Sequence, residues 1–134
     1  ENHAQTGGDL LEQMGYERVG SIVAQHVCLN TYETPFKIGE VQIVNYADKR
    51  VLHDEIVDLD RRLDYILERY AKKAEDRERI TLLWEKTKQL EIRIFNELPI
   101  SPEDLHRILN AEDWSLDRIE YQTVCNLNPD PTNI

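Results

Sequence analysis

The sequence has few cysteines and no long apolar run, and each shortage excludes a class of protein. The two cysteines, Cys28 and Cys125, lie far apart and match neither a zinc-finger spacing nor a redox spacing. We therefore expect a reduced, cytoplasmic setting. No apolar run approaches the roughly 18 residues that a membrane-spanning helix needs, and no signal-peptide pattern opens the chain. We expect no contact with a membrane.

The sequence also has fewer basic than acidic residues. Acidic residues outnumber Lys and Arg by 26 to 16, which gives a formal net charge of -10. Such a field repels phosphate backbones, so we expect no duplex nucleic acid as a partner. A small phosphorylated molecule or a nucleotide remains open as a ligand, because a bound divalent cation can invert the local sign of the charge.

The hydrophobic pattern of the first half indicates helices and shows no strand pair, internal repeat or linker. With 134 residues, of which 40% are hydrophobic, the chain is the size of one domain. We predict three helices here: from near His3 to Gly15, from Tyr16 to His26, and from Phe36 to Arg50, the last continuing or bending through His53. The third is apolar on more than one side, which is typical of a central, buried helix.

The second half shows ordinary amphipathic helices. Beyond Leu59, apolar residues recur at helical spacing (Leu63, Ile66, Leu67 and Tyr70), and charged residues, including Arg61 and Arg62, occupy the other faces. The longest predicted helix runs from Glu75 to Leu98, with a core stripe that includes Trp84, Leu90 and Ile94. Ser101 is expected to cap a short helix after it. We predict an all-α fold over 1–110 with a long C-terminal helix, and a poorly structured extension over 111–134.

Several segments in order resemble the second half of a metal-dependent phosphohydrolase of the HD-domain family. They are His3-x-x-x-Gly7, Leu10-Leu11, Gly15-Tyr16, Val19, Ile22-Val23, His26, the stretch from Val41 to Lys49, and its continuation through Arg50-Val51-Leu52-His53-Asp54 to Arg62 and Arg69-Tyr70. The similarity covers about the first half of the chain. It implies an HD-domain-like helical bundle, truncated at its N-terminal side.

The resemblance also implies a metal site. Asp48 matches the distal metal-binding Asp of the family, while His3 and His26 match its intervening histidines. Imidazoles with a carboxylate suit Mn, Fe, Co, Ni or Mg. Lys49, beside the Asp, is a candidate phosphate-binding cation. No catalytic residue can be assigned from the sequence.

Each of these residues also has an ordinary structural interpretation. His26 at a helix end can be a capping or partly buried histidine, and Lys49 and Arg50 can be solvated or ion-paired. The family's first His and its His-Asp pair have no counterpart before His3. The dipeptide His53-Asp54 stands after the distal Asp, in the wrong order, and fits a surface turn better.

Two functions therefore remain open at this stage. The first is hydrolysis of a phosphoester or nucleotide by the intact parent protein, of which this chain is the C-terminal portion with part of the site, so that the chain alone is expected to be inactive. The second is a non-catalytic HD-like module that binds a partner or a signal molecule. Apolar surface around Val19, Ile22, Ile43 and Val44 should be exposed or covered by a second copy, so we expect a homodimer.

Overall fold

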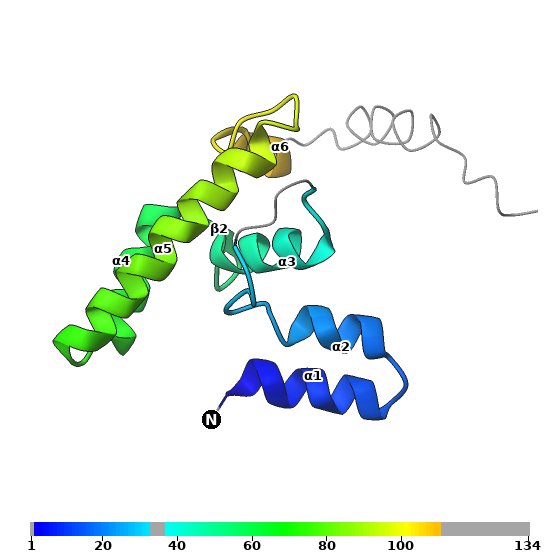
Figure 1. Cartoon of the computed structure of the whole chain (residues 1–134). Coiled ribbons are helices and arrows are strands. Elements are labelled where there is room, and N and C mark those ends of the chain that lie inside the picture. Colours follow the sequence, from blue (N-terminus) through cyan, green and yellow to red (C-terminus); the bar gives the residue numbers. More distant parts are fainter. Residues whose placement is uncertain (1, 33–36, 111–134) are drawn as a thin grey trace, which may run out of the picture. The chain divides into compact units, whose positions relative to one another are not determined.

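The computed structural model describes residues 2–32 and 37–110, and the described chain is mostly helical (Figure 1). The chain divides into two compact units, Glu1–Pro102 and Glu103–Ile134. The all-α prediction is thus confirmed at a coarse level. The extension predicted for 111–134 lies outside the described residues.

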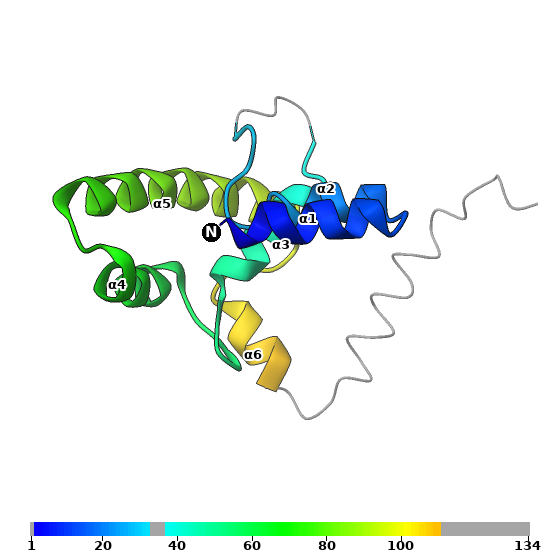
Figure 2. The ribbon, with the colours of Figure 1, turned by 90° about the horizontal axis from the view of Figure 1, so that it is seen from below.

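Helices α1 (His3–Gln13) and α2 (Glu17–Val23) form a close antiparallel pair. The two helices lie side by side in Figure 1 and overlap in the view from below in Figure 2. Their backbones approach at two glycines: a Cβ built on Gly8 would lie 2.8 Å from the Gly20 carbonyl oxygen. Gly15 ends α1 with φ of 86°, a left-handed conformation that favours glycine, as the sequence predicted.

Helix α3 (Glu40–Lys49) is followed by a two-stranded antiparallel hairpin. Of the two expectations for this segment, that the helix continues or bends through His53, continuation is wrong, and the expectation of no strand pair is wrong as well. Strands β1 (Val51–Leu52) and β2 (Glu55–Ile56) pair in the register Val51 to Ile56 and Leu52 to Glu55. Tertiary contacts decide this reversal. The Arg50 side chain donates to the carbonyl of Val57 at 2.6 Å, and the Val57 amide donates to the carbonyl of Arg50 at 2.8 Å.

The buried face of α3 carries polar side chains beside Tyr46, which corrects the prediction of a helix buried through apolar side chains on more than one side. Ile43 and Val44 are exposed, whereas Asn45, Lys49 and Arg50 are buried. The buried groups are used as donors to backbone carbonyls of other segments. Backbone carbonyls that are buried away from water need hydrogen-bond donors. The polar side chains of α3 are buried because they supply those donors.

Helices α4 (Leu59–Tyr70) and α5 (Ala74–Phe95) pack against each other and hold most of the core. The predicted stripe of α5 is confirmed, since Trp84, Leu90 and Ile94 are buried. They form one cluster with Leu29, Tyr46 and Leu59. The indole Nε1 of Trp84 donates to the carbonyl of Leu59 at 2.6 Å, which fixes the start of α4 against the middle of α5.

The second unit contributes one described helix, α6 (Asp104–Asn110). This helix begins three residues after Ser101, so the predicted N-cap does not stand at its start. In the part of the chain that the structure describes, no helix is both long and apolar enough to cross a membrane.

Candidate functional site

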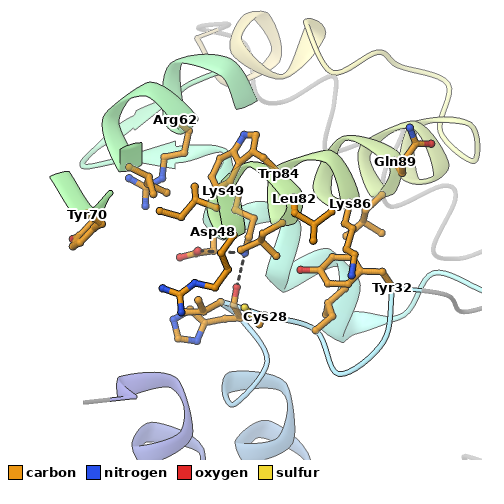
Figure 3. A pocket seen from close by; sticks show the side chains of 18 of the residues that line it. Cys28, Tyr32, Asp48, Lys49, Arg62, Tyr70, Leu82, Trp84, Lys86 and Gln89 are labelled. Atoms are coloured by element: carbon orange, nitrogen blue, oxygen red, sulfur yellow. Dashed lines mark hydrogen bonds and ion pairs between the residues drawn. The ribbon is translucent and has the colours of Figure 1, made fainter. Parts of the chain in front are cut away.

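A pocket of about 1340 Å³ lies within the first unit. Its walls come from His3 at the start of α1, the segment 26–32, the end of α3, one face of α4 and one face of α5. In Figure 3, Asp48 and Lys49 lie close together, with Arg62 and Tyr70 on one side and Tyr32 and Lys86 on the other. Segments far apart in the sequence therefore share one cavity.

The lining of this pocket is cationic, although the chain as a whole is strongly acidic. Among the described residues that line it, five are Lys or Arg (Lys49, Arg62, Arg79, Lys86 and Arg93), three are His (His3, His26 and His53) and one is acidic (Asp48). Four aromatic side chains complete it: Tyr32, Tyr65, Tyr70 and Trp84. A concentration of one sign of charge between apolar walls raises the local concentration of counter-ions. The pocket thus favours an anion.

His3 and His26 are in direct contact across the α1–α2 pair. Their Nε2 atoms lie 3.2 Å apart, and the rings meet edge to face with centroids 5.1 Å apart. Nδ1 of His26 lies 2.7 Å from the carbonyl oxygen of Val23, so this nitrogen carries the proton and donates it. In the neutral ring, the lone pair of His26 is then on Nε2, which faces His3.

The 3.2 Å contact is a hydrogen bond, in which Nε2–H of His3 donates to the lone pair on Nε2 of His26, and the same separation would suit two nitrogen ligands of one metal ion. Donors bound about 2.0–2.1 Å from an ion lie about 3.0–3.4 Å from each other at ordinary angles, which matches the separation of the two Nε2 atoms. A backbone carbonyl that accepts from the far ring nitrogen is the usual way in which a ligand histidine is oriented. Among the described residues, however, no three His, Cys, Asp or Glu side chains are grouped closely enough to hold a metal.

Asp48 lines the same pocket but is not grouped with the two histidines. Its side chain is 40% exposed, and its Oδ2 lies 3.8 Å from Nζ of Lys49. The structure therefore brings together two of the three predicted ligands, and places the third in the same cavity as a partly solvated carboxylate.

Lys49 is buried at the edge of the pocket and is held by backbone carbonyls. Its Nζ donates to the carbonyl of His26 at 2.8 Å and to that of Asn45 at 3.1 Å. Burial lowers the pKa of Lys49 to about 8; the charges of Asp48 and Cys28 oppose this shift, and that of Arg62 adds to it. The side-chain amide of Asn45 donates to the same His26 carbonyl at 3.1 Å. Lys49 and Asn45 together hold the His26 backbone.

Most residues of the pocket were not assigned to the site from the sequence, His53 and Arg62 among them. His53, in the turn of the β-hairpin with φ of 57°, packs edge to face on Tyr65 with centroids 5.7 Å apart. Arg62, which we expected on the polar face of α4, lines the pocket instead. Its position carried a signal: Arg62 follows Leu59 by three residues and precedes Ile66 by four, which is the spacing of one helix face.

Comparisons of the chain with protein-family models, with curated proteins and with solved structures found no match.

Proposed function

We propose that the pocket binds a small phosphorylated molecule, such as a nucleotide, and that the intact protein is a metal-dependent phosphohydrolase. The observation that carries this proposal is the gathering of five basic side chains and three histidines around one cavity in a chain of net charge -10. Basic side chains scattered over the protein surface would be ordinary solvated residues. Cations that share a cavity with imidazoles and aromatic rings are placed to bind a compact anion.

His3 and His26 would hold the divalent metal, with Asp48 as a further ligand and the rest of the ligand set supplied from outside this group. A divalent metal in such a site polarises a phosphoryl oxygen and lowers the pKa of a bound water. The side chains of the pocket itself have simpler tasks. The Val23 carbonyl orients the His26 ring, Lys49 fixes the His26 backbone, and the remaining cations offset the charge of the ligand.

A metal titration of the purified chain tests this proposal. Calorimetry with Co²⁺ or Ni²⁺ on metal-free protein should show one saturable site, because two preoriented imidazoles share one coordination space. His3→Ala and His26→Ala should each abolish it, and Asp48→Ala should weaken it. His53→Ala is the matched control, since His53 lines the same pocket but packs on Tyr65. Equal affinity in all five proteins would contradict the ligand assignment.

A second candidate is a non-catalytic helical module that binds the same class of anion. It is favoured by the lack of a three-ligand group among the described residues. The two candidates differ in metal content: the hydrolase retains metal after purification of the intact protein and loses turnover of phosphoesters with a chelator, whereas the module binds its ligand equally well without metal.

We also propose that the chain forms a homodimer. Val19 on α2 and Ile43 and Val44 on α3 are exposed to 48%, 44% and 39%, as the sequence led us to expect, whereas Ile22, the fourth residue of that prediction, is half-buried. Helices α2 and α3 are packed neighbours, and exposed apolar side chains on adjacent elements are typical of a protein interface.

A further inference from the structure

Arg62 differs from Lys49, Arg79 and Arg93 of the pocket because no hydrogen bond or ion pair is made by its side chain among the described residues. It lies on α4, is half-buried, and lines the cavity. Its Nε is buried and has no hydrogen-bond partner among the described residues. A buried donor without a partner is costly, since it has lost water and gained nothing in return.

Three of the four other basic residues of the lining are already engaged in hydrogen bonds or ion pairs; the fourth, Lys86, lies over the Tyr32 ring, with Nζ 5.5 Å from the ring centroid. Lys49 donates to the carbonyls of His26 and Asn45, Arg93 donates to the carbonyl of Tyr32 at 3.1 Å, and Arg79 pairs with Asp76 at 3.4 Å. A ligand that recruited Lys49 or Arg93 would first have to break a hydrogen bond to a backbone carbonyl of a distant segment.

The Arg62 guanidinium is also held in place from one side. Its Cζ lies 5.6 Å from the centre of the Tyr65 ring, and the same ring packs edge to face with His53. A guanidinium at this distance over an aromatic ring is attracted by the negative face of the ring. Its charge also acts on Lys49, so both cations contribute to the potential of the same part of the pocket.

We propose that Arg62 is the phosphate-binding residue of this pocket. A planar fork of N–H donors matches two oxygens of a phosphate, and charge-assisted hydrogen bonds of this kind are the strongest that side chains form with anions. This assignment rests on the proposed function, because it names the group that recognises the ligand of the same site.

The test uses inorganic pyrophosphate as the probe, titrated calorimetrically into the whole chain in low-salt, metal-free buffer. The wild type should bind with saturation. Arg62→Met should weaken binding at least tenfold, and Arg62→Lys, which keeps the charge but not the fork, should fall between. Arg61→Met is the matched control: it removes the same charge from the next residue of α4, where Arg61 pairs with Glu55 on the surface at 2.7 Å. That variant should change affinity less than twofold.

Circular dichroism and urea midpoints establish that each variant is folded, and Arg62→Gln replaces Arg62→Met if the latter is not. Equal weakening by Arg61→Met and Arg62→Met would overturn the assignment, because only net charge would then matter. Unchanged affinity in Arg62→Met would overturn it as well, while leaving the metal site of His3 and His26 intact. A wild type that does not bind pyrophosphate overturns both this assignment and the phosphorylated ligand class. Malonate serves as the carboxylate arm, and binding of malonate as tight as pyrophosphate would overturn specificity for phosphate.

Discussion

The Arg50 side chain, at the C-terminal end of α3, connects several segments of the chain. Arg50 donates to the carbonyls of Val57 and Pro102 and to Glu91 and the Tyr46 hydroxyl. Burial, with the neighbouring Glu91 carboxylate, raises the pKa of Tyr46 far above its usual value, so this hydroxyl stays protonated and can donate to Glu91. One guanidinium thus links the hairpin, α3, α5 and the turn before the second unit.

Loss of Glu91 should destabilise the protein strongly. Glu91→Ala leaves the buried Arg50 guanidinium without its counter-charge, at a cost of about 3 kcal/mol in the free energy of unfolding. Glu55→Ala is the control, because the Glu55–Arg61 pair is more than half exposed and should contribute about 0.5 kcal/mol. Urea denaturation of the three proteins measures the difference. Similar losses for the two variants would contradict the role of the Arg50 cluster.

Lys49 should make stability rise with alkaline pH. Its pKa is about 8 in the folded chain against 10.5 for the free side chain, so between these values the unfolded state holds a proton that the folded state has released. Stability then increases with pH over this window, by about 3 kcal/mol at most. The measurement is the unfolding free energy of wild type minus that of Lys49→Met, in metal-free buffer from pH 7 to 10.5. A difference that is constant with pH would show that Lys49 titrates normally.

At the scale of elements, the α1–α2 pair decides whether His3 reaches His26. The two helices can pack this closely only because Gly8 and Gly20 have no side chain at the point of contact. A Cβ on Gly20 would lie 2.7 Å from the Gly8 carbonyl oxygen, while one on Gly7 would meet a Val23 methyl at an ordinary 3.4 Å. Adjacent glycines of one helix therefore have different constraints.

Gly8→Ala should destabilise the protein by about 1–3 kcal/mol, because the added methyl group forces the two helices apart. Gly7→Ala should be neutral or stabilising by up to about 1 kcal/mol, since alanine is the better helix former and has room. Thermal or urea unfolding of both variants checks this contrast. Gly8→Ala should also weaken Co²⁺ binding by moving His3 away from His26. Equal stabilities would mean that the helices do not approach as closely as described.

At the scale of the whole molecule, charge and apolar surface are distributed unevenly. The net charge is -10, yet the pocket collects cations, and apolar side chains of α2 and α3 face solvent. An acidic exterior disfavours nonspecific association, so a dimer formed through these apolar residues would be specific to that face.

Sedimentation velocity at micromolar concentration should therefore show a dimer. Replacing Ile43 and Val44 together with glutamate should yield a monomer, because two charges would be buried without partners. The matched control replaces Leu82 and Ile92 of α5 with glutamate in the same way. These two residues are exposed to 60% and 53%, and their replacement should leave the dimer unchanged. A wild-type protein that sediments as a monomer would contradict the proposed homodimer.

The sequence by itself determined the helices, because local periodicity and capping act within a few residues. The stripe of α5, the stop at Gly15 and the amphipathic run of α4 could all be predicted in this way. It also indicated His3, His26, Asp48 and Lys49, all of which line one pocket.

Only the tertiary structure decided how these residues are used. The hairpin at Val51–Ile56 depends on an Arg50 that bonds to Val57, and no local propensity contains that contact. The Nε2 atoms of His3 and His26 meet because two glycines let helices approach, and Lys49 is committed to a carbonyl 23 residues away. Burial and long-range hydrogen bonds decide such roles, because their energies depend on groups that the chain brings together only when it folds.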